Sequence, residues 1–385
     1  MPSSALRPEN NLLLLIARRN VDDSTAHAIR DLLRQSRFDW EYLSSAASVH
    51  GVKPLLTYHL EAKAADLVPQ AVLEQLQTEN LQATEFNLWL AGQLVEIASR
   101  MHEAGLWCVS FKGPTLAMMA YGDLGLRPFS DLDLYIRRAD FARLKALLTD
   151  IGFSMVRRMN PAREAALLRF DYALAFANEQ DVLLDIHWRF APAYASLRLP
   201  SAEMDHRIES ISIAGRPLLT FSPEDLLLIL ACHGFSHSWE KLIWICDLAT
   251  LFQEREDFDW DYVLRQADHS RVLGIVLLGL ALAEKLGGSL PKHVREAVEK
   301  EEVGTPANEV FEQIFESAIA RAPSLSLQLR MRQRLSDRIG SLSRFIFTPR
   351  DYDCMFASLP LPFLYYLVRP VRMARTYGMK ILKVG

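Results

Sequence analysis

The sequence predicts an α+β fold in which a small mixed β-sheet core is flanked by N-terminal and C-terminal helical domains. Residues 11–105 show almost unbroken helical apolar spacing, and helical spacing returns from residue 222. Short apolar or alternating runs, typical of strands, gather between residues 107 and 190. We therefore expect domains at 1–104, 105–221 and 222–345, followed by an apolar and basic tail at 346–385.

The N-terminal domain is expected to be entirely helical. Apolar residues recur at helical spacing in five stretches, which cover residues 12–16, 25–34, 40–49, 53–60 and 68–104. The last stretch is long, and its second half should pack on the sheet and lead into the first strand. The four stretches before it are expected to form a cap over the core.

Residues 107–137 organise the core. The apolar run 107–111 is typical of a buried strand, and Lys-Gly-Pro at 112–114 interrupts it. Proline suits the first position of a helix, so we predict a helix that begins at Pro114 and continues over 115–121. Gly122, Gly125 and Pro128 then form a loop before an alternating strand at 131–136.

The alternating strand places two acids on one face. Residues i and i+2 of a strand point the same way, so Asp131 and Asp133 share a face while Leu132, Leu134 and Ile136 share the other. Two neighbouring carboxylates repel one another. A hard divalent cation with oxygen ligands is the commonest compensation, which predicts a metal site.

The glycine turn before this strand favours an anion. A strand–Gly–helix turn allows close approach to a bound group, and the amides of a helix N-terminus attract negative charge such as a triphosphate. Lys112 and Arg127 are available as cationic partners. An anion site close to a two-carboxylate strand is the layout needed for two-metal phosphoryl or nucleotidyl transfer.

A third acid lies in a later strand. Residues 182–188 are strongly apolar apart from Asp185 and His187, and an aspartate in a buried strand is rare unless it is paired or bound to metal. Between the acids we predict an amphipathic helix over 139–151 and a strand over 171–177 that turns at 178–180. The resulting order of elements suits a mixed sheet with helices on one side.

These residues resemble the DNA polymerase β-like nucleotidyltransferase superfamily, in particular its bacterial uncharacterised nucleotidyltransferase branch. The resemblance is carried by Phe-Lys-Gly at 111–113, by Arg-Pro-Phe-Ser-Asp-Leu-Asp-Leu at 127–134 and by Asp-Ile-His-Trp-Arg at 185–189. It implies that Asp131, Asp133 and Asp185 are catalytic and hold Mg²⁺ or Mn²⁺ against an NTP. It also implies nucleotide contacts from Lys112, Gly113, Arg127, Ser130 and His187. Lys-Gly replaces the more usual Gly-Ser or Gly-Gly, so a hydroxyl that would touch phosphate is missing.

A helical segment over 223–252, opened by a serine cap at Ser222, carries a second group of candidates. His233 and His237 are four residues apart, a spacing that also suits zinc, but no third ligand is apparent. The resemblance implies instead a wall facing nucleotide or substrate, made of His233, His237, Trp239, Lys241, Trp244 and Asp247. Core packing is the alternative for the two tryptophans, and a salt bridge or helix cap is the alternative for Asp247.

Composition argues against a nucleic-acid-binding or membrane-spanning protein. The net charge of −4 gives no global basic field for nucleic acid, and the four cysteines show no CxxC pair. Reduced thiols, no basic-then-apolar leader and no apolar run of transmembrane length predict a cytoplasmic protein without a membrane span.

The C-terminal region holds two further features. Residues 321–345 are rich in arginine, which we interpret as a solvated face. In the tail, the apolar run 356–368 precedes a basic stretch without acids at 369–385. It is expected to dock on the helical domain, or to form a peripheral contact through 356–385 with an anionic membrane, a partner or a nucleic-acid strand.

We therefore expect a Mg-dependent enzyme that moves a nucleoside monophosphate from an NTP to a hydroxyl of an unidentified acceptor, with a small molecule or modified peptide favoured. Two alternatives stay open. One is a toxin-like or processing nucleotidyltransferase that acts on RNA or protein, although nucleic acid is not favoured. The other is a catalytically silent nucleotide-binding scaffold.

Overall fold

The computed structural model of the chain describes residues 6–35, 37–190, 199, 202–253, 255–315, 327, 330, 331 and 339. The tail at 346–385, with the contact predicted through 356–385, lies outside the described residues. The same holds for most of the arginine-rich stretch at 321–345.

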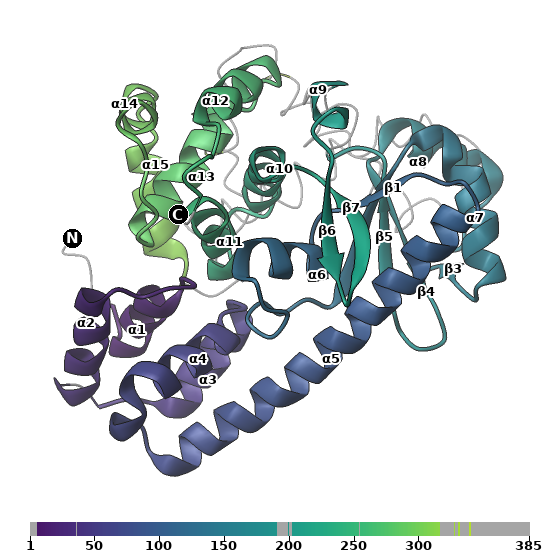
Figure 1. The fold of residues 1–385 in the computed structure, drawn as a ribbon. Coiled ribbons are helices and arrows are strands. Elements are labelled where there is room, and N and C mark those ends of the chain that lie inside the picture. Colours follow the sequence, from purple (N-terminus) through teal and green to yellow (C-terminus); the bar gives the residue numbers. More distant parts are fainter. Residues whose placement is uncertain are drawn as a thin grey trace, which may run out of the picture.

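Five helices make up the N-terminal region, as predicted. They are α1 (Pro8–Ile16), α2 (Asp23–Gln35), α3 (Trp40–Val49), α4 (Lys53–Ala64) and α5 (Gln70–Glu103), with a 3₁₀ turn, η1 (Ala65–Leu67), before α5. Asp39 caps α3 by accepting a hydrogen bond from the amide of Tyr42. Helix α5 runs from the group α1–α4 across to the sheet (Figure 1).

The core is a five-stranded mixed sheet with the order β1-β2-β5-β4-β3. Its strands are β1 (Cys108–Ser110), β2 (Asp131–Ile136), β3 (Ser154–Met155), β4 (Ala173–Ala177) and β5 (Leu183–His187). Strands β2 and β5 pair in parallel, while the other neighbours are antiparallel. The α+β class with a small mixed sheet and flanking helices is therefore confirmed.

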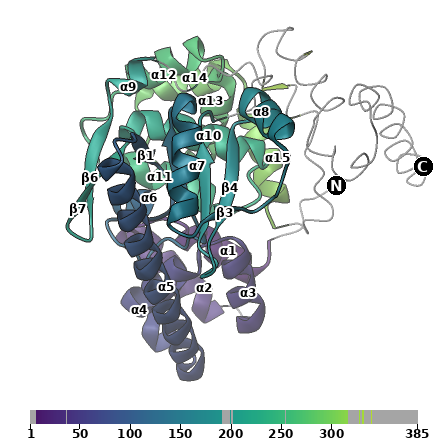
Figure 2. The same cartoon turned by 90° about the vertical axis from the view of Figure 1, so that its right-hand side faces the viewer.

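One face of the sheet is covered by two helices. Leucines and isoleucines of β2 and β5 form a hydrophobic cluster with α5 and with α7 (Phe141–Asp150), which follows the 3₁₀ turn η3 (Arg138–Asp140). Figure 2 shows α5 and α7 side by side over the strands. Because alternate residues of a strand point to opposite faces, the acids of β2 must face away from these helices.

Several elements of the core differ from the predicted ones. The helix after the first strand begins at Gly113, with α6 (Gly113–Leu116) continuing as a π-helical turn, η2 (Ala117–Tyr121). Strand β3, helix α8 (Pro161–Phe170) and the short helix α9 (Ala202–Asp205) are additional elements. The predicted hairpin at 211–219 is real but longer, with β6 (Glu209–Ile213) paired to β7 (Arg216–Thr220).

The C-terminal helices are α10 (Pro223–Ser236), α11 (Leu242–Gln253), α12 (Trp260–His269), α13 (Leu273–Lys285), α14 (Lys292–Lys300) and α15 (Gly304–Gln313). The prediction of one continuous helix over 223–252 is wrong, because α10 ends at Ser236 and α11 begins at Leu242. His233 and His237 still lie side by side, with ring centroids 4.8 Å apart. Ser238 and Trp239 have positive φ angles of 55° and 53°, which no helix accommodates. The chain reverses there and folds the fully buried Trp239 ring back onto Gly234.

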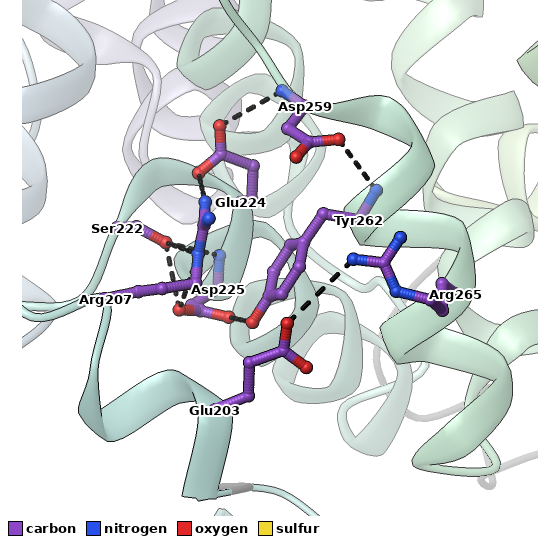
Figure 3. Close-up of polar contacts among 8 residues, drawn as sticks. All are labelled: Glu203, Arg207, Ser222, Glu224, Asp225, Asp259, Tyr262 and Arg265. Atoms are coloured by element: carbon purple, nitrogen blue, oxygen red, sulfur yellow. Dashed lines mark hydrogen bonds and ion pairs between the residues drawn. The ribbon is translucent and has the colours of Figure 1, made fainter.

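A polar network joins the hairpin region to the C-terminal helices (Figure 3). Tyr262 donates a 2.5 Å hydrogen bond to the fully buried Asp225, which also accepts one from Ser222 at 2.9 Å. Arg207 pairs with Glu224 at 2.6 Å, and its guanidinium lies 4.0 Å from the centre of the Tyr262 ring. This network fixes the segment between α9 and α10 to α12.

The N-terminal and C-terminal helices share one hydrophobic core. Buried side chains of α1, α3 and α4 belong to the same cluster as those of α10, α11 and α13. A division at residues 104, 221 and 345 therefore stays a prediction. Within the described part of the chain, every helix is too short or too polar to cross a bilayer.

Candidate active site

Strands β2 and β5 bring the predicted acids together. The parallel register places Asp133 directly opposite Asp185, and Asp131 lies two residues earlier on β2. His187 lies two residues after Asp185 and therefore shares its face. Acidic and imidazole side chains thus gather on the face of the sheet that α5 and α7 leave uncovered.

Asp133 is held by two donors on the same oxygen. Its Oδ1 accepts a hydrogen bond from Lys112 Nζ at 3.1 Å and lies 3.0 Å from His187 Nε2. The side chain is only 3% exposed. Burial opposes the ionised form, but Lys112 and His187 together hold the pKa of Asp133 far below its usual range. Asp133 is therefore a permanent carboxylate.

The other two acids have no such support. Among the described residues, neither Asp131 nor Asp185 has a hydrogen-bond donor or an ion-pair partner for its carboxylate. Burial, followed by repulsion from Asp133, raises the pKa of Asp131 to about 6 and also raises the pKa of Asp185. Half-buried carboxylates that repel one another call for a further cation.

The residues fit a divalent metal. Asp133, Asp185 and His187 each offer a ligand atom, and these atoms lie within 4.8 Å of one another. Carboxylate oxygens suit Mg²⁺ or Mn²⁺, and imidazole is also a metal ligand. The Nδ1 atom of His187 is buried without a hydrogen-bond partner among the described residues. His187, which the sequence assigned to the nucleotide, thus lies within the group that could hold metal.

Gly113 allows the turn before α6 to come close to the acids. Its φ angle is +51°, and a Cβ atom there would lie 3.1 Å from the carbonyl oxygen of Asp131. Only glycine combines this backbone conformation with that approach at no steric cost. The turn thus positions Lys112 beside Asp133, while Ser130 lies exposed just before β2.

Arg127 and Asp247 bind one another. The guanidinium donates to both carboxylate oxygens, at 2.8 and 2.9 Å, and the side chains are 8% and 1% exposed. Tyr121 donates a third hydrogen bond to Asp247 at 2.8 Å. Asn87 of α5 donates to the backbone carbonyl of Arg127 at 3.1 Å. In this structure the polar atoms of both side chains are used in the salt bridge, which was the alternative predicted for Asp247. The nucleotide roles of Arg127 and Asp247 stay predictions.

The predicted wall divides into two parts. The rings of His233, His237 and Trp244 lie 4.8–5.3 Å apart, and the Lys241 ammonium lies 5.7 Å from the Trp244 ring. Burial, followed by the nearby charge of Lys112, holds the pKa of His233 well below its usual range. Neutral His233 therefore lies in the electrostatic reach of Lys112 and Asp133, within a cluster of aromatic rings that Lys241 borders. Trp239 belongs instead to the hydrophobic core.

A model of known protein families settles the class of the chain. The family described as "Uncharacterised nucleotidyltransferase" matches residues 36–288, which is more than half of the chain. The chain belongs to this nucleotidyltransferase family. The match spans the sheet, the acids and the helices α10 and α11, so the nucleotidyltransferase has its whole candidate site inside the family region.

Among solved structures, the nucleotidyltransferase is similar to an antigenic nucleotidyltransferase-like protein from Paracoccidioides brasiliensis, at 15% identity and a TM-score of 0.36, over 52% of this chain and 93% of the other. It is also similar to ANT(2")-Ia in complex with adenylyl-2"-tobramycin, at 18% identity and a TM-score of 0.29, over 55% and 97% of the two chains. No curated protein sequence gives a significant match.

Two residues that support the nucleotidyltransferase site were not predicted from sequence. Tyr121 of η2 donates to Asp247, the partner of Arg127, and Asn87 of α5 donates to the backbone carbonyl of Arg127. Asn87 is 2% exposed, and a buried polar side chain needs a hydrogen-bond partner. In the sequence, its only signal is that a polar residue stands on the apolar face of the helix. Tyr121 gives no signal, since a tyrosine at the end of a helix is ordinary.

Proposed function

We propose that this nucleotidyltransferase moves a nucleoside monophosphate from an NTP to a hydroxyl group of an acceptor, with Mg²⁺ or Mn²⁺. The proposal is supported above all by Asp133 and Asp185, which lie opposite one another on parallel strands. A buried acid pair without enough counter-charge destabilises the fold, so a catalytic need for cations explains its presence.

Asp133, Asp185 and His187 would hold the cation, and Asp131, two residues before Asp133 on the same face of β2, is proposed as a further ligand. A bound divalent ion supplies charge neutralisation at the transferring phosphate and lowers the pKa of the attacking hydroxyl. Asp185 carries the raised pKa of an unpaired carboxyl and is the residue proposed to accept the acceptor's proton. Asp133, with its strongly lowered pKa, serves as a permanent anionic ligand.

The phosphates would lie at the turn before α6. Lys112 would neutralise negative charge there, and the Gly113 amide would donate a hydrogen bond, with Ser130 close by. Arg127 adds positive potential near the acids while it remains paired with Asp247. The rings of His233, His237 and Trp244 with Lys241 offer an aromatic surface for a base or for the acceptor.

A small molecule or a modified peptide is the favoured acceptor. The net charge of −4 gives no general attraction for an RNA backbone. ANT(2")-Ia, one of the similar structures, was captured with an adenylylated small molecule. RNA or a protein hydroxyl is the alternative acceptor class.

A transfer screen tests the proposal. The protein is incubated with each α-³²P-labelled NTP, with Mg²⁺ or Mn²⁺, and with acceptor pools of small molecules, peptides, proteins and RNA. Transfer is expected to fall by orders of magnitude in Asp185→Asn, while nucleotide binding measured by thermal shift persists. Equal transfer by the variant and the original protein would contradict the role of Asp185, and absence of label from all acceptors would contradict the proposed activity.

A further inference from the structure

Lys112 has a second contact that the phosphate role does not explain. Its ammonium donates to Asp133 Oδ1, the oxygen that also contacts His187, so this carboxylate is already neutralised by the protein itself. Lys112 is 15% exposed and belongs to the loop between β1 and α6, so its side chain is partly open to solvent. Its side chain has four rotatable bonds and its charge is free to change partner.

We propose that Lys112 acts as an internal cation that competes with the divalent metal for the acid group and is drawn away from it by the triphosphate. The inference rests on the proposed function and adds a reason for metal and nucleotide to bind together. A positive charge 3.1 Å from Asp133 Oδ1 repels an incoming metal ion, so the metal alone binds weakly.

A bound triphosphate reverses this balance. Its negative oxygens offer Lys112 a partner with more charge than one carboxylate, and the released carboxylate then gains affinity for metal. Metal and nucleotide therefore favour one another's binding, as linkage requires of any such coupling. This arrangement also explains why lysine precedes Gly113. A serine or glycine at that position would leave Asp133 with His187 alone.

Metal binding without nucleotide tests the inference directly. Mn²⁺ affinity is measured by electron paramagnetic resonance at pH 8. Lys112→Gln keeps a hydrogen-bond donor and removes the charge. The variant is expected to bind Mn²⁺ about tenfold more tightly than the original protein, which corresponds to about 1.4 kcal/mol.

Lys145→Gln is the matched control. Lys145 pairs with Glu164 on α7 and α8, so its removal changes the net charge equally but leaves the acid group intact. Its Mn²⁺ affinity should equal that of the original protein. Unchanged or weaker Mn²⁺ binding by Lys112→Gln would overturn the inference.

Nucleotide measurements separate this inference from the proposed function. In the original protein, the α,β-methylene analogues of ATP, GTP, CTP and UTP are tested in turn, and the one that binds should tighten Mn²⁺ binding. In Lys112→Gln this tightening should be reduced at least tenfold. If labelled transfer is present but the coupling is the same in both proteins, the proposed function stands and the Lys112 inference fails. If Lys112→Gln does not fold, Lys112→Ala with added propylammonium replaces it, and there the added amine should weaken Mn²⁺ binding.

Discussion

The buried pair Arg127–Asp247 offers the sharpest test of the structure. Both side chains are almost inaccessible, and two hydrogen bonds of 2.8 and 2.9 Å join them. Removing one partner leaves the other charged group buried without compensation, which costs about 3–5 kcal/mol. Asp247→Leu should lower the free energy of unfolding by this amount, and Arg127→Met should do the same.

The double variant Arg127→Met/Asp247→Leu separates the pair from simple packing loss. With no charge left to bury, its stability should return to within about 1 kcal/mol of the original protein. The exposed pair Arg30–Asp66 is the control, because it has two hydrogen bonds of 2.6 Å but side chains that are 28% and 62% exposed. Equivalent changes there should cost only about 0–1 kcal/mol.

Urea unfolding followed by tryptophan fluorescence gives each free energy. The reasoning is refuted if Asp247→Leu is as stable as the original protein. It is also refuted if the double variant is no more stable than the weaker single variant, because the cost would then lie in lost packing and not in an unpaired charge.

Three further predictions concern glycines and pH. Gly234→Ala should lower the free energy of unfolding by about 1–3 kcal/mol, because the new Cβ would lie 2.3 Å from the Trp239 ring. Gly92→Ala is the control: it has open space around it, so the change should stabilise α5, and thermal melting compares the two variants. Gly113→Ala should weaken nucleotide binding in calorimetry without unfolding the protein, since φ is +51° and the backbone of β2 is in the way; unchanged binding would contradict the role of the turn. Asp225→Asn should change the pH dependence of stability. Burial raises the pKa of Asp225 from 3.8 to about 6. The free energy of unfolding should therefore fall between pH 4 and pH 6, by up to about 3 kcal/mol, as this carboxyl is forced to ionise in the folded state. Urea unfolding of the Asn variant should show no such decrease.

The sequence was sufficient wherever a local pattern determines the structure. Alternation in 131–136 was enough to identify β2 and the face of its acids, and an aspartate inside an apolar run was enough to identify β5. Strand β3 was missed because two residues are too short to show a period. Helix α8 was missed because its polar and apolar residues are mixed on every face.

Long-range pairings left no trace in the sequence. Arg127 and Asp247 are 120 residues apart, and either one alone looks like a surface charge. The break between α10 and α11 was hidden because the segment is apolar on both sides of Trp239. Its cause is a side-chain contact with Gly234, which no periodic pattern records. The grouping of His187 with the acids likewise depended on the parallel register of β2 and β5.

Helix α5 has a mechanical consequence. At 34 residues it is a rod about 51 Å long, anchored against α4 at one end and against the sheet at the other. Asn87, near its middle, holds the backbone carbonyls of Leu124 and Arg127, in the loop that leads into β2. A small tilt of α5 would therefore shift this loop and, with it, Asp131 at the start of β2. Helices α1–α4, of which α4 packs on α5, are thus connected to the loop before β2 through a single rigid element.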